Sequence, residues 1–280
     1  MKNLTPYFQI ISCFFFALLG VQIKMSLVEN NIENIVFYRS FFGAIILFLL
    51  ILFSKEKYLI ILKTQNIKIH LLRSFFGILA MYFGYKSLLY ISLAQASTVG
   101  FSKVFFTCIL ASFIFSEKLD FKTVLLILTG FFGIILIANP GQINDSTGIY
   151  MSLFSAICVS GGIISISYLS KSEKTTSILF YHSILSTLIF LIIFFEQITF
   201  SFNSDLFNYV SLTINALLGQ YFNTESYKDI STNKVVIQSY SRIIFSTIFG
   251  FFFFSEKIYL LNIVGIVIVI FTSFFVRRNS

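Results

Sequence analysis

Apolar residues run through this chain in blocks of about twenty, and short polar breaks separate the blocks. A helix needs about 20 apolar residues to cross a bilayer core of roughly 30 Å. The blocks lack the period-2 alternation that membrane β-strands show. The pattern predicts an all-α integral membrane protein with ten transmembrane helices, at Pro6–Ile23, Ile35–Phe53, Leu71–Leu89, Ala94–Phe115, Phe121–Ala138, Ile149–Leu169, Ile178–Phe195, Leu206–Ser226, Val235–Phe254 and Tyr259–Val276.

The break at Asn139-Pro140-Gly141 divides the predicted helices into two sets of five. Other breaks, such as Ser116–Asp120, are short enough for tight connections between antiparallel helices. We therefore expect two five-helix repeats, residues 1–140 and 141–280.

Local sequence repeats support this division. An offset of 139 residues aligns Phe115-Ser116-Glu117-Lys118 with Phe254-Ser255-Glu256-Lys257, and Ser102-Lys103 with Ser241-Arg242. An offset of 143 aligns Phe37–Ser40 with Phe180–Ser183. Because five is odd, the second copy must enter the membrane from the opposite side. Inverted repeats of this kind place a substrate site near the midplane and allow alternating access.

Composition agrees with a membrane protein, since 57% of the residues are apolar and only 11% are charged. The net charge of +8 does not indicate nucleic-acid binding, because the basic residues lie in the breaks. Cys13, Cys108 and Cys158 lie inside apolar blocks and follow no pairing motif, which favours small core residues. We expect no disulfide, metal site or cofactor, and partners limited to the lipid bilayer and a small-molecule substrate, with a homodimer left open.

The distribution of basic residues predicts the orientation. With the N-terminus in the cytoplasm, fourteen basic residues fall on or near that side: Lys2, Lys55, Lys57, Lys63, Lys68, Arg73, Lys118, Lys122, Lys171, Lys174, Lys228, Lys234, Arg277 and Arg278. The opposite side keeps three, Lys24, Arg39 and Lys257. By the positive-inside rule, both termini are predicted to be cytoplasmic, in a bacterial inner membrane.

Two basic residues lie deep within predicted helices. Lys103 is about nine residues into its helix, roughly 14 Å from the end at 1.5 Å per residue. Its repeat mate Arg242 is similarly deep. A cation there costs at least about 2.5 to 3.5 kcal/mol, so both should face a polar cavity. They would bind a carboxylate or phosphate, unless they pair with Glu225 or with helix carbonyls.

Further candidates come from the same repeat. Glu225, the one acid expected within a span, would hold a substrate ammonium or take part in proton coupling. Its mate Lys86 either joins it or reaches the membrane interface. Arg39 and His182 form a third pair, as coupling or gating residues or as helix anchors. Glu117 and Glu256 are better explained as charges that complement the dipole of the helix that follows each.

Polar side chains at similar depths complete the predicted site. Tyr82, Tyr221, Gln238 and Ser102 are candidate substrate-binding residues, and Gln22, Tyr85, Gln220, Asn223 and Tyr240 are further ones. Each alone is equally explained as a hydrogen bond between membrane helices. Gly77 and Gly84 indicate close helix packing.

The chain resembles the drug/metabolite transporter superfamily, specifically proteins with paired EamA domains. The resemblance rests on the two Phe-Ser-Glu-Lys motifs and on the stretch Leu93–Ser102 that enters the fourth span. It implies transport of amino acids, nucleotide-sugar-like compounds, S-adenosylmethionine or assorted amphiphiles through a central cavity between the halves. Val104 and Ile243 stand where the family often has proline, which predicts fourth and ninth helices without the family's kinks.

The sequence thus favours a secondary transporter or exchanger for a small carboxylate-bearing metabolite, an amino acid, an amino-acid-like compound or S-adenosylmethionine. A membrane enzyme would need acids, nucleophiles or metal ligands gathered at one depth, and no such motif is visible. A structural membrane subunit is the other alternative.

Overall fold

The computed structural model describes residues 5–54, 62–91, 93–118, 120–138, 146–199, 205–255 and 259–278. These residues form helices and contain no β-strand. The helices are α1 (Thr5–Ser26), α2 (Ile32–Leu52), α4 (Ile67–Ser87), α5 (Leu93–Gly100), α6 (Lys103–Phe115), α7 (Phe121–Ala138), α8 (Ser146–Leu169), α9 (Thr175–Ile193), α10 (Asp205–Ser226), α11 (Thr232–Gln238), α12 (Ser241–Phe254) and α13 (Leu260–Arg278). The all-α prediction is confirmed. The Asn139-Pro140-Gly141 break, Lys2, Lys55, Lys57, Glu256 and Lys257 lie outside the described residues.

Two predicted spans are broken near their middle. The fourth is divided into α5 and α6, and the ninth into α11 and α12. At the first break Ser102 N–H donates to the Val99 carbonyl, three residues back, at 3.1 Å. At the second, Ser239 N–H donates to the Val236 carbonyl, also at 3.1 Å.

The prediction of unkinked fourth and ninth helices is therefore wrong. Serine hydroxyls at the breaks compete for backbone carbonyls in place of proline. Ser102 Oγ donates to Val99 O at 2.7 Å, and Ser239 Oγ donates to Val236 O at 2.6 Å. Such back-bonding by serine bends helices.

The repeated Phe-Ser-Glu-Lys motif forms the same helix end twice. Ser116 follows α6 with φ of 54°, and Ser255 follows α12 with φ of 52°. Positive φ is uncommon for residues other than glycine, and it is the usual way to end a helix sharply. The sequence repeat therefore corresponds to a structural repeat at these two positions.

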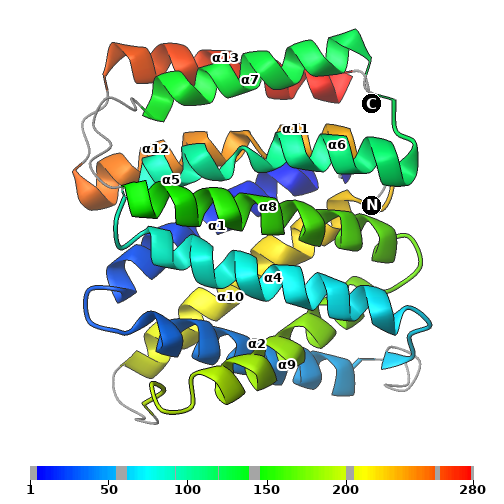
Figure 1. The fold of residues 1–280 in the computed structure, drawn as a ribbon, viewed down its shortest axis with the longest axis vertical. Helices are drawn as coiled ribbons and strands as arrows, with labels where there is room; N and C mark the ends of the chain where they lie inside the picture. Colours follow the sequence, from blue (N-terminus) through cyan, green and yellow to red (C-terminus); the bar gives the residue numbers. More distant parts are fainter. Residues whose placement is uncertain are drawn as a thin grey trace.

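The helices lie side by side, and helices of the first half pack on helices of the second half (Figure 1). α1, the first helix of the first half, packs on α10 and α12 of the second half. α8, the first helix of the second half, packs in the same way on α4 and α6 of the first half. α2 pairs with α9 at one edge of the molecule, and α7 pairs with α13 at the other. Both ends of the chain lie at the same end of the bundle (Figure 1).

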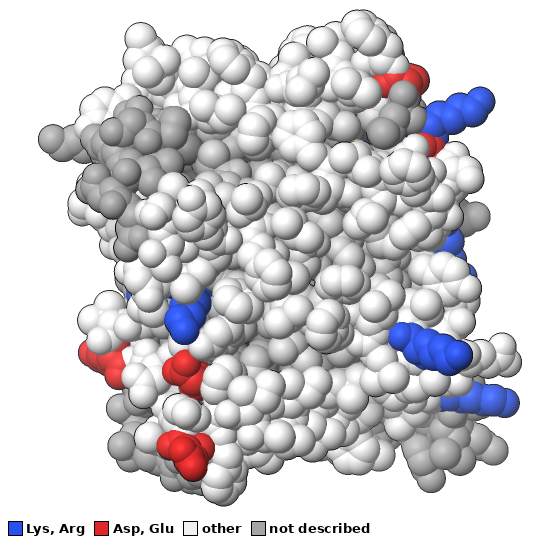
Figure 2. Space-filling model, in the orientation of Figure 1, with Lys and Arg blue, Asp and Glu red and all other residues white. Residues whose placement is uncertain are grey.

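The exterior is that of a multi-pass membrane protein. Among the described residues, seven helical stretches are long and apolar enough to cross a membrane, and α7 and α13 contain shorter apolar segments. Large apolar side chains such as Phe113, Ile192 and Phe252 are exposed to the surroundings. Charged side chains gather toward the two ends of the helices and leave a broad uncharged band between them (Figure 2). Lipid is the solvent that suits such a band.

Two apolar clusters form the interior. One joins α6, α7, α8, α11, α12 and α13 around Val104, Tyr227 and Tyr240. The other joins α1, α2, α4, α9 and α10 around Ile35, Met81 and Leu212. The three cysteines are buried with free thiols, as expected for core residues.

Candidate functional site

A cavity of about 260 Å³ lies between the two apolar clusters. Its walls come from both halves of the chain: α1, α2, α4, α5 and α6 from the first, and α8, α9, α10 and α12 from the second. Phe101 and Ile163 of one cluster and Leu19 and Met81 of the other line it. The volume is near the lower end of the roughly 300 to 1,000 Å³ typical of small-molecule sites.

Four basic side chains line this cavity: Arg39, Arg73, Lys103 and Arg242. Lys103 and Arg242 follow the breaks within the fourth and ninth spans. Arg39 lies seven residues from the start of α2 and Arg73 six residues from the start of α4, which is roughly 10 Å from the nearer helix end at 1.5 Å per residue. No aspartate or glutamate is among the described residues of the wall. The cavity therefore carries concentrated positive charge.

Aromatic rings take the place of acidic partners. The Arg242 guanidinium lies 5.6 Å from the centre of the Phe16 ring, and Lys103 Nζ lies 5.2 Å from that of Phe101. Arg39 lies 5.7 Å from the centre of the Tyr85 ring and also contacts the sulfur of Met81. A cation over an aromatic face is stabilised by about 0.5 to 2 kcal/mol. That is less than a buried charge costs, which leaves these cations suited to an anionic ligand.

Several hydrogen-bond donors of these residues remain unpaired. The Nε atoms of Arg39, Arg73 and Arg242 are buried and have no hydrogen-bond partner among the described residues. A buried unsatisfied donor costs about 1 to 3 kcal/mol, and more when the group is charged. A ligand oxygen in the cavity would recover this cost.

The lack of a side chain at Gly77 of α4 makes room for the side chains of Arg73 and His182. A Cβ at residue 77 would collide with Nη1 of Arg73 and lie 2.6 Å from Cε1 of His182. The close approach therefore requires glycine, and it brings the guanidinium of α4 beside the imidazole of α9. His182 Nδ1 and Ser186 Oγ also share a hydrogen bond of 3.3 Å.

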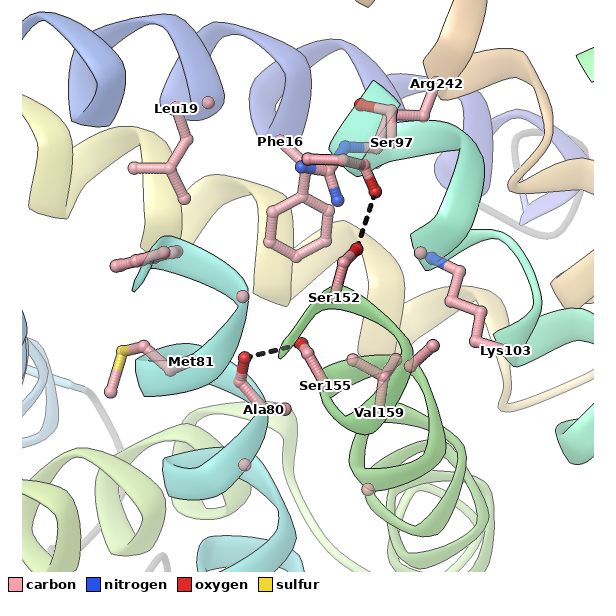
Figure 3. Close-up of a pocket in the computed structure, with 18 of the residues that line it drawn as sticks. Phe16, Leu19, Ala80, Met81, Ser97, Lys103, Ser152, Ser155, Val159 and Arg242 are labelled. Carbon is pink, nitrogen blue, oxygen red and sulfur yellow. Dashed lines mark hydrogen bonds between the residues drawn. The ribbon is translucent and has the colours of Figure 1, made fainter. Parts of the chain in front are cut away.

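Serine hydroxyls hold the cavity wall together (Figure 3). Ser152 Oγ of α8 donates to the Ala96 carbonyl of α5 at 3.0 Å, and Ser155 Oγ donates to the Ala80 carbonyl of α4 at 2.7 Å. These bonds fix α8 against two helices of the first half, so the wall is pre-formed.

The cavity brings together four residues that the sequence analysis proposed for substrate binding or for gating: Lys103, Arg242, Arg39 and His182. Tyr85, Gln220 and Asn223 also line it. Their role in binding stays a prediction.

Glu225 lies elsewhere. Its carboxylate forms a 2.6 Å ion pair with Lys228 and accepts a 2.5 Å hydrogen bond from Thr175 Oγ1. These contacts join the end of α10 to the start of α9, outside the cavity wall. Its position does not support a role in offsetting Lys103 and Arg242 or in holding a ligand ammonium there.

Lys86 and Tyr82 also lie outside the cavity wall. Lys86 Nζ donates to Tyr82 Oη at 3.1 Å, and Tyr82 Oη donates to Glu33 Oε1 at 3.3 Å. The three residues connect the last turns of α4 to the start of α2. Of the two roles that the sequence allowed for Lys86, its position fits the one at the membrane interface.

The remaining candidates do not line the cavity either. Tyr221 is 41% exposed, and Ser102 bonds within its own helix break. Gln238 is buried at the α11–α12 break, with neither amide atom paired among the described residues. Tyr240 donates to the Ile127 carbonyl at 3.2 Å, and Gln22 bonds to Ser211 and Asn215 of α10, so these two connect helices.

Arg73 is a cavity residue that the sequence reasoning missed. The third span was expected to begin at Leu71, which would put Arg73 at the membrane edge. α4 instead begins at Ile67, one helical turn earlier, and Arg73 is only 6% exposed. The apolar residues Ile67 and Ile69, on either side of Lys68, were the available signal.

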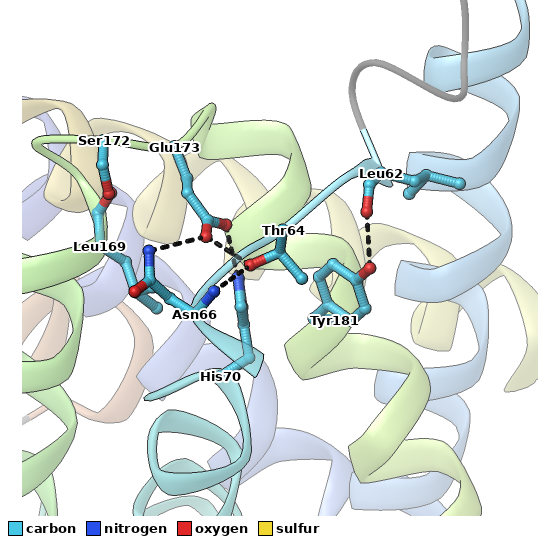
Figure 4. A network of polar contacts seen from close by, with 8 residues as sticks. All are labelled: Leu62, Thr64, Asn66, His70, Leu169, Ser172, Glu173 and Tyr181. Carbon is cyan, nitrogen blue, oxygen red and sulfur yellow. Dashed lines mark hydrogen bonds and ion pairs between the residues drawn. The ribbon is translucent and has the colours of Figure 1, made fainter. Parts of the chain in front are cut away.

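A second polar cluster joins the halves near one end of the helices (Figure 4). His70 Nε2 pairs with Glu173 Oε2 at 2.5 Å, and Thr64 Oγ1 donates to Glu173 Oε1 at 2.5 Å. The Tyr181 ring lies 4.5 Å from that of His70, and its hydroxyl donates to the Leu62 carbonyl at 2.6 Å. His70 lies within α4 and is 1% exposed.

Glu117 makes a third contact between the halves. Its two carboxylate oxygens accept hydrogen bonds from the backbone N–H groups of Thr232 and Asn233, at 2.8 and 2.9 Å. The carboxylate therefore caps α11 of the second half, whereas the sequence assigned it to the helix that follows it. The physical reason is unchanged, since helix N-termini favour negative charge.

The fold and the cavity define a multi-pass helical membrane protein with a basic cavity between two five-span halves. The chain matches the EamA-like transporter family over residues 5–139 and 146–278, and it belongs to that family. It is a transporter of the drug/metabolite superfamily rather than an enzyme, as its relatives' names also indicate.

Its relatives include named transporters from bacteria. A pseudopaline exporter of Pseudomonas aeruginosa is 24% identical over 265 residues, covering 93% of this chain and 91% of the relative. An S-adenosylmethionine uptake transporter of Rickettsia conorii is 25% identical, covering 87% and 82%. A crystal structure with 12% identity superposes with a TM-score of 0.78 over 98% of this chain and 97% of its own, which shows a shared fold.

Proposed function

We propose that this protein moves a small carboxylate-bearing metabolite, an amino acid or an amino-acid-like compound, across the bacterial cytoplasmic membrane. The observation that carries this proposal is the set of four basic side chains around one cavity between the halves. Arginine presents a planar fork of donors that matches a carboxylate, and a desolvated guanidinium binds it strongly.

The transport mechanism we propose is alternating access between two inverted halves. The matching packing of α1 and α8, each on helices of the other half, supports it. The breaks in the fourth and ninth spans beside Lys103 and Arg242 also support it. Broken helices at the membrane midplane are a recurring feature of substrate sites in secondary transporters. S-adenosylmethionine belongs to the proposed substrate class, because it carries a carboxylate and a ring able to stack on Tyr85 or Phe16.

The proposed orientation has both termini in the cytoplasm. The same end of the helices holds both ends of the chain and the connections at residues 62–66, 116–118 and 170–174 (Figure 1). These connections contain Lys63, Lys118, Lys171 and Lys174. Such a basic side is the one that faces the cytoplasm under the positive-inside rule.

Counterflow in proteoliposomes tests the function directly. Vesicles loaded with an unlabelled amino acid or with S-adenosylmethionine should accumulate the same labelled compound from outside, and empty liposomes should not. The proposal is contradicted if the folded protein exchanges cationic or uncharged solutes but no carboxylate-bearing one.

A further inference from the structure

The basic residues of the cavity fall into two groups. Arg73 Nη1 and the His182 ring lie together beside Gly77, and Arg39 and His182 line one small cavity together, so these three form the Arg39 group. Lys103 and Arg242 lie together on one side of the main cavity and form the Arg242 group (Figure 3). Like charges held together in a buried space are costly unless a ligand of opposite charge binds between them.

The two groups lie against different helices. Nη1 of Arg73 lies beside Gly77 of α4 and 4.0 Å from the Cβ position of Gly162 of α8. Nη2 of Arg242 lies 3.9 Å from the Cβ position of Gly20 of α1. Met81, which contacts Arg39, lies on the opposite side of the cavity from Lys103 and Arg242, with Ser152 and Ser155 between them (Figure 3).

The described wall between the groups carries no charged side chain. Tyr85 lines the cavity, and the centre of its ring lies 5.7 Å from the Arg39 guanidinium. Phe16 lies under Arg242, and Leu19 lies one turn further along α1. A ligand that spans this wall needs an uncharged middle and a charged group at each end.

We propose that the cavity contains two separate anion subsites, and that the transported metabolite carries two anionic groups, one for each. The inference rests on the proposed function and narrows its substrate class from carboxylates to dianions such as dicarboxylates. Two of the three unpaired guanidinium nitrogens, those of Arg39 and Arg73, belong to one subsite, and the third, of Arg242, belongs to the other. Arg39 and Arg73 are 7% and 6% exposed.

Equilibrium binding to the purified protein tests the two-subsite arrangement. The probes are succinate, glutarate and adipate, each beside its monoamide, which replaces one carboxylate by an uncharged group of the same size. At the best chain length we expect the dicarboxylate to bind at least about tenfold more tightly than its monoamide, because one charge-assisted hydrogen-bond set is lost.

Variants locate the two groups. Arg73→Gln and Arg242→Gln should each reduce the dicarboxylate's advantage to about threefold or less. Arg73→Lys and Arg242→Lys, which keep the charge, should retain part of it. Lys86→Gln, a basic residue outside the wall, should leave it unchanged. Thermal unfolding without ligand identifies any variant that fails to fold.

The outcomes separate this inference from the proposed function. Equal binding of a dicarboxylate and its monoamide at every chain length would overturn the two-subsite inference, while carboxylate counterflow would still support the transporter. No binding of either by the folded wild-type protein would overturn the inference as well. If Arg73→Gln removed the advantage and Arg242→Gln did not, the second subsite would be wrong.

Discussion

Lys103 and Arg242 occupy equivalent positions in two broken helices, and both line the same cavity. Lys103 is the first residue of α6, and Arg242 is the second residue of α12. Each follows a turn whose serine hydroxyl bonds to a carbonyl three residues earlier. The repeat in the sequence thus brings one cation from each half to the centre of the molecule.

Gly77→Ala should disrupt the cavity. The new methyl group would lie 2.6 Å from the His182 ring and would also meet Arg73, and overpacking of this kind costs about 1 to 3 kcal/mol. We expect a lower unfolding temperature and a loss of transport. Gly162→Ala is the matched control, since its nearest neighbour would be 4.0 Å away. Equal effects of the two substitutions would contradict the role assigned to Gly77.

Glu117→Ala should destabilise the contact between the halves. The substitution leaves the N–H groups of Thr232 and Asn233 without their acceptor, at a cost of about 1 to 3 kcal/mol. Glu117→Gln keeps one acceptor oxygen and should cost less. Thermal unfolding in detergent measures both. Glu196→Ala, at an exposed residue, should change stability by less than about 0.5 kcal/mol. A stable Glu117→Ala protein would show that the cap is dispensable.

His70 and Glu173 should prove energetically coupled. Removing one partner of the buried His70–Glu173 hydrogen bond leaves the other unsatisfied, which costs about 1 to 3 kcal/mol and more for a charged group, and His70 is 1% exposed. We expect His70→Ala and Glu173→Gln each to lower stability, and the double variant to lower it by less than their sum. Additive effects would indicate that each residue acts through other contacts, such as Thr64 for Glu173.

Cysteine labelling should reveal the orientation. Cys13, Cys108 and Cys158 are at most 3% exposed, so an impermeant maleimide should react with introduced cysteines only. Val28→Cys, at the end opposite the termini, should be labelled from outside intact cells. Ser172→Cys, in the connection between α8 and α9, should react only after lysis. The reverse pattern would place both termini outside.

The helices could be predicted from hydropathy because membrane thickness sets the length of each apolar block. For this reason α7, α8 and α10 begin and end close to the predicted limits, and α12 ends at the predicted residue, Phe254. The breaks at residues 101–102 and 239–240 could not, because serine, unlike proline, bends a helix only where its hydroxyl bonds back to the chain.

The site was harder to predict than the fold, because depth along a helix does not tell which face a residue occupies. Lys103 and Arg242 were found since no cation at their depth can face lipid cheaply. Glu225 was also expected within a span, but it lies at the end of α10, where Lys228 at i+3 provides a local partner. Arg73 was missed through an error of one turn in the start of α4.

The central claim is that Lys103 and Arg242 bind an anionic group of the transported solute. Counterflow of labelled carboxylate-bearing amino acids should be compared for wild type, Lys103→Gln, Arg242→Gln and the control Lys86→Gln. Losing a buried charge contact costs about 2 to 5 kcal/mol, so we predict at least a 30-fold lower apparent affinity in the first two variants and normal flux in the third. Undiminished flux in folded Lys103→Gln and Arg242→Gln proteins would contradict the account.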